Sequence, residues 1–187
     1  VRRQRQMCIR DRHNVVYTDI ENTDNYDHIY QSDLCGWVGQ LGYNKDSIYG
    51  ANVFTAEGNE TLKAASFYAT GKDSQYELYV VRQFEDETSL EKMIPVASGK
   101  LGNAGYYTVD FNQGIEVDAG ERYAVVLYII TPGSVHPMAI EYAADEATEN
   151  VDLDDGESYI SANGSKWVSV DTVEKSNLCI KAFSDNR

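Results

Sequence analysis

Hydrophobic and polar residues alternate with a period of two along most of the chain. The clearest case is residues 61–70, where Leu62 and Tyr68 fall on one side of the alternation and Lys63 on the other. Such alternation, in segments rich in β-branched and aromatic residues, is typical of half-buried β-strands. We expect further strands at residues 52–56, 75–84, 105–111, 122–131, 137–143, 158–162, 166–170 and 177–183.

Turn-forming residues separate these segments. Glycine, proline, asparagine and aspartate mark turns at residues 57–59, 71–73, 102–103, 118–120, 132–133, 155–156 and 163–164. About nine short strands joined by such turns predict an all-β protein, in which antiparallel strands form a β-sandwich or a barrel.

Three segments carry more specific expectations. Residues 122–131 are almost continuously apolar, which predicts a central strand buried on both faces. Residues 112–114 are expected to form a turn after the strand at 105–111. Residues 85–93 are highly charged, and they predict either one turn of helix or a loop.

One domain is expected, at residues 34–185. Residues 13–33 are polar, acidic and rich in asparagine, which predicts a linker that becomes an ordered entry segment of the domain. Residues 1–12 hold five Arg and one Asp, and such an arm can bind nucleic acid or begin a signal peptide. No apolar segment follows, however, and the string RQRQMCIRDR resembles translated sequencing-adaptor sequence. We therefore expect residues 1–12 to be a non-native artefact, with the native chain starting near His13.

Composition restricts the class of partner. The 187 residues include 30 acidic and 16 basic side chains, which gives a net charge of −14. Because phosphates and anionic lipids need a basic surface, neither nucleic acid nor an acidic membrane is expected as a partner. No apolar stretch reaches the roughly 18 residues of a membrane span.

Two cysteines, Cys35 and Cys179, lie near opposite ends of the expected domain. They predict either one disulfide, if the ends of the domain meet, or two thiols. The third cysteine, Cys8, falls in the segment expected to be non-native. No CxxC pair is present for zinc or redox chemistry.

Several phrases of the sequence occur in an order that resembles one known family. The most specific are YGANVFTAEGNETLKAASFYA at residues 49–69 and GESYISANGSKW at 156–167, and DNYDHIYQSD, AGERYAVVLYIITPG and HPMAIE accompany them. Over about residues 22–184 the chain resembles the lectin-like domain found C-terminal to papain-like cysteine peptidases in secreted proteins of gut Firmicutes.

The resemblance implies a β-sandwich of jelly-roll type and an extracellular or cell-surface location. It also implies a non-catalytic module that binds glycan or cell-surface material and so targets an upstream peptidase domain of the same polypeptide. The alternative is a structural domain that packs on the peptidase and stabilises it without binding sugar.

Catalysis is not expected of this chain. A papain-like enzyme needs a nucleophilic Cys with a His base. The sequence around that Cys resembles C-G-[SA]-C-[WY], and only Cys35-Gly36-Trp37 matches it in part. The catalytic His of such an enzyme lies about 130 residues after the Cys, and no His stands at that spacing here. His136 is too close to Cys35. Peptidase activity is therefore expected to belong to a domain that lies outside this sequence.

Two sets of residues are candidates for ligand or metal binding. Sugars bind to aromatic faces flanked by a few polar groups, and the candidate aromatic residues are Tyr26, Tyr30, Trp37, Tyr43, Tyr106 and Trp167. No cofactor is required, but carboxylates close together can hold calcium. The candidate calcium ligands are Asp152, Asp154, Asp155 and Glu157, which otherwise form a solvated acidic turn.

Overall fold

The computed structural model describes residues 24–146, 148–154 and 157–187, and within them the protein is built from three antiparallel sheets. The four-stranded sheet has the order β1 (His28–Tyr30), β13 (Ile180–Asn186), β4 (Glu60–Ala69) and β7 (Gly105–Val117). The six-stranded sheet has the order β11 (Val168–Ser169), β10 (Glu157–Ser161), β3 (Ser47–Thr55), β8 (Arg122–Ile130), β5 (Ser74–Val81) and β6 (Ile94–Leu101). The three-stranded sheet has the order β12 (Asn177–Leu178), β9 (Met138–Glu141) and β2 (Gly39–Leu41).

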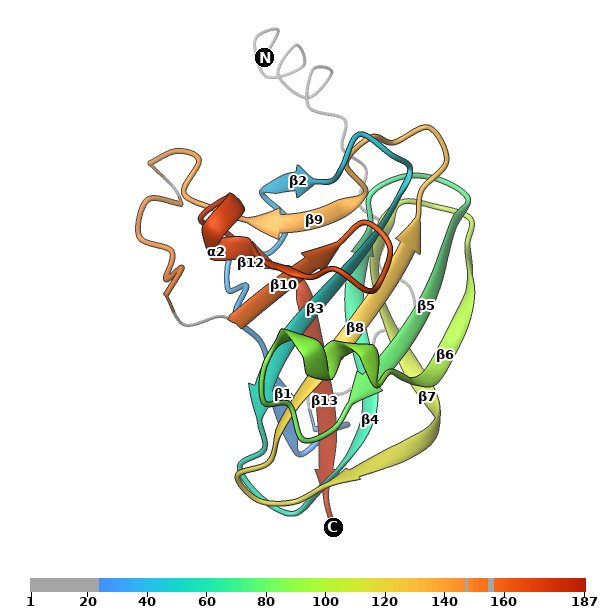
Figure 1. Ribbon diagram of the computed structural model, residues 1–187, viewed down its shortest axis with the longest axis vertical. Coiled ribbons are helices and arrows are strands. Elements are labelled where there is room, and N and C mark those ends of the chain that lie inside the picture. The colour runs from blue at the N-terminus through green and yellow to red at the C-terminus, as the bar shows by residue number, and fades with distance from the viewer. Residues whose placement is uncertain (1–23, 147, 155–156) are drawn as a thin grey trace, which may run out of the picture.

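The prediction of an all-β, antiparallel sandwich is confirmed. The two larger sheets lie face to face, and the short sheet closes one end, where β2 and β9 lie (Figure 1). The described residues form thirteen strands rather than about nine, because several short strands carry too few residues to show an alternation. The jelly-roll connection of these strands stays a prediction.

Alternate residues of each strand point into the space between the larger sheets. Leu62 and Phe67 from one sheet and Leu78, Leu127 and Ile129 from the other are all buried there. Burying side chains of this size contributes roughly 1.5–3 kcal/mol each. The period of two in the sequence therefore reflects one face that packs on the opposite sheet and one that does not.

A second, smaller core lies on the outer face of the six-stranded sheet. The 3₁₀ helix η1 (Glu87–Glu91), green in Figure 1, crosses this face and buries Leu90, with Phe84, against Val81 and Val126 of the sheet. Asp86 begins the helix, since its carboxylate accepts the Thr88 amide. Of the two alternatives for residues 85–93, a turn of helix or a loop, the structure has the turn of helix, and η1 does not cover the part of this face where Gln75 and Tyr128 lie.

Two strands differ from the sequence-based expectation. β7 runs without a break through residues 112–114, so the turn expected there is wrong: a bulge in the pairing with β4, between Leu62 and Ala64, absorbs the irregularity instead. β1 falls within residues 13–33, the expected linker and ordered entry segment, where no strand was expected, and it pairs with the last strand, β13. The ordered sheet therefore begins before residue 34, while residues 1–12 lie outside the described part of the chain.

Three further expectations concern burial and bonding. β8 is central, but Tyr128 and Ile130 at its end are only half-buried. Cys35 is exposed and Cys179 is buried, and both are free thiols. In the described residues there is no helix with the length and apolar character needed to cross a membrane. A short helix, α2 (Val170–Val173), packs on β10 and β11.

Candidate functional site

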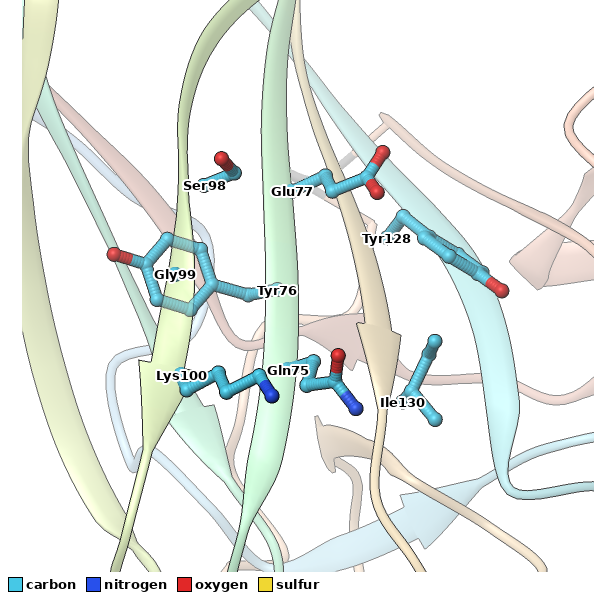
Figure 2. Close-up of a pocket in the computed structure, with 8 residues that line it drawn as sticks. All are labelled: Gln75, Tyr76, Glu77, Ser98, Gly99, Lys100, Tyr128 and Ile130. Atoms are coloured by element: carbon cyan, nitrogen blue, oxygen red, sulfur yellow. The ribbon is translucent and has the colours of Figure 1, made fainter.

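The open part of the six-stranded sheet forms a shallow hollow of about 260 Å³ on β5, β6 and β8. Figure 2 shows the Tyr128 ring at one side of this hollow, Lys100 at the other side, and Gln75 and Glu77 between them. The hollow is lined by Gln75, Tyr76, Glu77, Ser98, Gly99, Lys100, Tyr128 and Ile130.

Strand register places these side chains together. Gln75 lies opposite Lys100 on β6 and Ile130 on β8, which makes one row across three strands. Glu77 lies opposite Ser98 and Tyr128, which makes the next row. Residues two apart on a strand share a face, so both rows point away from the core on the same side of the sheet.

An aromatic stack holds the Tyr128 ring in place. Tyr49 of β3 lies parallel to it, with ring centroids 4.2 Å apart, and Trp167 meets Tyr49 edge-on at 6.2 Å. Gly164, at a left-handed φ of 76°, approaches the Tyr49 ring so closely that a Cβ there would lie 3.2 Å from it. Partial burial raises the pKa of Tyr49, which keeps its hydroxyl neutral.

The polar groups of the hollow face solvent. Gln75, Ser98 and Lys100 are exposed, and within the described part of the chain their side chains have no protein hydrogen-bond or ion-pair partner. The Glu77 carboxylate accepts the Tyr79 hydroxyl, and burial together with this carboxylate raises the pKa of Tyr79. The hollow thus offers an amide, an ammonium, a hydroxyl and a carboxylate beside one supported ring.

The structure places the six predicted ligand-binding aromatic residues in three different regions. Trp167 does not line the hollow, but it packs edge-on against Tyr49, whose ring stacks on Tyr128. Tyr30 and Tyr43 pack against the main core, and the Tyr30 hydroxyl donates to Glu60 at 2.8 Å. The other three, Tyr26, Trp37 and Tyr106, lie on the opposite sheet.

Sequence reasoning missed the residues that line the hollow. The predicted aromatic residues lie in or near expected loops, whereas Tyr128 lies inside the most apolar strand of the chain. One signal was available: the alternation across 75–84 placed Glu77 and Tyr79 on the face opposite Leu78. A charged residue and a tyrosine on that face indicate an outer surface that is exposed.

The acidic turn does not gather its carboxylates. Asp152 uses its side chain to accept the Asp154 amide at 3.0 Å, and Glu157 binds Arg122 and the Tyr159 hydroxyl. Asp155 lies outside the described residues. No group of three or more His, Cys, Asp or Glu side chains suited to a metal ion is found in the described ranges.

A different set of oxygens surrounds the buried side chain of Asn177. Its Nδ2 lies 2.8 Å from the carbonyl oxygen of Asp152, 3.0 Å from that of Ser32, and 3.1 Å from Oε2 of Glu141. An amide nitrogen has only two hydrogens to donate, so three acceptors exceed what it can satisfy. Rotation of the amide by half a turn would put its oxygen among the other three, and four oxygens that meet in a buried place suit a hard cation.

Comparison with known proteins identifies the class of domain. The family described as lectin like domain matches residues 29–184. The structure is similar to that of the clostridial cysteine protease Cwp84 after propeptide cleavage, with a TM-score of 0.71 and 24% identity over 86% of this chain and 40% of that chain.

A second structure gives the same result. It contains the cysteine protease and lectin-like domains of Cwp84, a surface layer associated protein of Clostridium difficile, and it matches with a TM-score of 0.66 and 20% identity over 86% of this chain and 36% of that chain. The chain thus spans less than half of each matched chain. Comparison with curated proteins finds no match. Since the family match covers most of the sequence, the chain belongs to the lectin-like domain family.

Proposed function

We propose that this chain is a non-catalytic accessory domain of a secreted cysteine peptidase, and that it binds glycan in the hollow on the six-stranded sheet. The observation that carries the proposal is the supported Tyr128 ring beside polar side chains that have no protein partner. Because Cwp84 combines a cysteine protease domain with a lectin-like domain and is associated with the surface layer, a cell-surface role is a reasonable expectation for this chain.

The chemistry of the hollow suits a sugar. The C–H face of a pyranose ring packs on an aromatic face, and its hydroxyls then point sideways to hydrogen-bonding groups. Gln75 can donate and accept, Lys100 can only donate and Glu77 can only accept. Such a set matches hydroxyls, each of which both donates and accepts.

Replacement of Gln75 by alanine is expected to weaken glycan binding about fivefold, which corresponds to the loss of one hydrogen bond worth about 1 kcal/mol. The full chain is first screened on an array of bacterial and host glycans, and the strongest ligand is then titrated by calorimetry. Gln113→Ala, at an exposed glutamine on β7, is the matched control and should bind as the wild type does. Absence of any glycan ligand, or equal loss in both variants, would argue against the hollow as the binding site.

A second function, packing on the peptidase without sugar binding, is favoured by a separate observation. Four large hydrophobic side chains are exposed on or beside the four-stranded sheet, on the opposite side of the molecule from the hollow. Packing on the peptidase would use a different face from the hollow, so a domain that packs there can also bind glycan. A glycan screen without ligands, in a protein that still contacts its peptidase, would leave only the packing role.

We also propose a structural calcium ion at the Asn177 cluster, with Glu141 as the carboxylate ligand and the carbonyls of Ser32 and Asp152 beside it. Calcium at tenfold above its Kd is expected to raise the melting temperature by about 4 °C, because an ion that binds only the folded state stabilises it. Glu141→Gln should abolish the rise, which is measured by thermal unfolding with calcium and with EDTA. Asp154→Asn should retain it; a rise lost only in Asp154→Asn would return the site to the acidic turn.

A further inference from the structure

The outer face of the four-stranded sheet is uncovered by the helices, since η1 packs on the six-stranded sheet and α2 on β10 and β11. Four exposed hydrophobic side chains lie on or beside it: Leu34 is 72% exposed, Ile29 55%, Tyr106 44% and Trp37 37%. Half of the large exposed hydrophobic residues in the described chain thus lie on this sheet or in the segment that follows its first strand. Such concentration is a mark of a surface that another protein covers.

Three aromatic rings form the centre of this face. Tyr68 of β4 lies between Tyr106 of β7, at 4.9 Å, and Trp37 of the segment after β1, at 5.8 Å. Gly36 comes so close to Tyr68 that a Cβ there would lie 2.9 Å from its hydroxyl oxygen, and its φ of 71° needs glycine. The rings are therefore held by two strands and a fixed turn before any partner binds.

The polar groups of the same face are already paired with one another. The hydroxyls of Ser66 and Tyr106 lie 2.5 Å apart, and the Lys181 ammonium lies 2.9 Å from the buried carboxylate of Asp33. The hydrogen-bonding groups that a sugar needs are therefore occupied, in contrast to the hollow on the other sheet. Apolar area with few free charges is instead typical of the centre of a protein interface.

The position of the face along the chain indicates which partner covers it. Ile29 belongs to β1, and Leu34 and Trp37 follow directly, so the exposed side chains cluster where the chain enters the sheet. A domain attached ahead of β1 is tethered beside this face, and tethering raises its effective concentration there. Domain interfaces of this kind bury roughly 600–1,500 Å², and Trp and Tyr are their most frequent anchors.

We propose that the outer face of the four-stranded sheet docks the cysteine peptidase domain of the same polypeptide, with Trp37, Tyr106 and Leu34 as its anchors. The inference rests on the proposed accessory function, and it adds the surface through which the two domains meet. Docking there leaves the hollow on the six-stranded sheet open, so the peptidase and a glycan can be bound at the same time.

The test uses the polypeptide extended upstream through its peptidase domain, obtained by sequencing the gene ahead of the His13 codon. Oxidative footprinting compares the labelling of Trp37, Tyr106 and Tyr128 in the extended polypeptide and in the present chain. We expect Trp37 and Tyr106 to lose labelling in the extended polypeptide, while Tyr128 is labelled equally in both.

Leu34→Asp tests the face without disturbing the fold, because this side chain is exposed. In the extended polypeptide it should restore labelling of Trp37, whereas Val173→Asp, at a valine 52% exposed on α2, should leave the protection unchanged. Equal labelling of Trp37 with and without the peptidase overturns the proposal. The proposal is also overturned if Trp37 is protected from labelling in the present chain alone and this protection increases with protein concentration. A second copy of the chain, rather than the peptidase, would then cover the face.

Failure of docking and failure of the proposed function give different results. If a peptidase is encoded upstream and Trp37 stays fully labelled, the docking surface is wrong while the accessory role stands. If the gene encodes no peptidase, both the accessory role and the docking proposal fall. Glycan binding at Tyr128 is measured on the present chain and does not depend on either result.

Discussion

Replacement of Asn52 by alanine is expected to lower the free energy of unfolding by about 3 kcal/mol. Asn52 lies in β3 and is 1% exposed. Its amide donates to the carbonyls of Leu178 and Ile180 at 2.9 Å each, and its oxygen accepts the Ser158 hydroxyl at 2.7 Å. Alanine would take the amide donor away from two buried carbonyls and the acceptor away from the Ser158 hydroxyl, and each buried group that loses its partner costs about 1–3 kcal/mol.

Equilibrium unfolding in urea measures the effect. Asn103→Ala removes an exposed asparagine side chain and should change the free energy of unfolding by less than about 0.5 kcal/mol. Asn52→Asp keeps the size of the side chain but removes the donor, and it should be at least as unstable as Asn52→Ala because a buried carboxylate would face two carbonyls. A loss below about 1 kcal/mol in Asn52→Ala would mean that the three groups find other partners.

Gly50, next to Ala51 and Asn52 in β3, explains why the sequence predicts this strand too short. The alternation was recognised only at residues 52–56, whereas the strand covers Ser47–Thr55. Glycine and asparagine are uncommon in strands, and here each has a tertiary reason. Asn52 binds backbone groups of β12 and β13, and a Cβ on Gly50 would lie 2.6 Å from the Met138 side chain. Neither reason is visible until the sheets are packed together.

The edge strand β6 (Ile94–Leu101) was also not predicted from the sequence. β6 contains Pro95 and Gly99, which together argue against a strand in sequence. In the structure β6 is the last strand of its sheet, where proline costs no ladder hydrogen bond. By contrast, β4, β5 and β8 were predicted within a few residues of their observed ends, because each buries one side against the core along its whole length.

The candidate site was predicted least well, and the reason is geometric. An aromatic side chain binds a sugar only where the surface around it is open, and openness depends on which elements cover a sheet. Tyr128 and Val126 lie on the same face of β8, yet the smaller core under η1 buries Val126 and leaves Tyr128 half-exposed. The sequence of β8 is apolar at both places, so the position of η1 decides which of them can meet a ligand.

Tyr128→Ala is expected to weaken glycan binding by about 2 kcal/mol, or roughly 30-fold, because it removes the ring on which the sugar packs. Tyr128→Phe keeps the ring and its stacking on Tyr49 and should bind within about threefold of the wild type, since a phenyl face stacks as a phenol does. Calorimetric titration with the ligand found on the array measures both variants. Equal losses in the two variants would show that the hydroxyl, rather than the ring, contacts the sugar.

Tyr106→Ala is the control that separates the two faces of the sandwich. Tyr106 and Tyr128 are both partly exposed tyrosines on strands, and each lies against another tyrosine ring. If glycan binds at the hollow, Tyr106→Ala should retain full affinity, while Tyr128→Ala should lose it. If both variants lose affinity to the same extent, the loss follows from a general loosening of the sheets, and the hollow is not the site. Because the two rings lie on opposite sheets, a difference between the variants assigns glycan binding to one face alone.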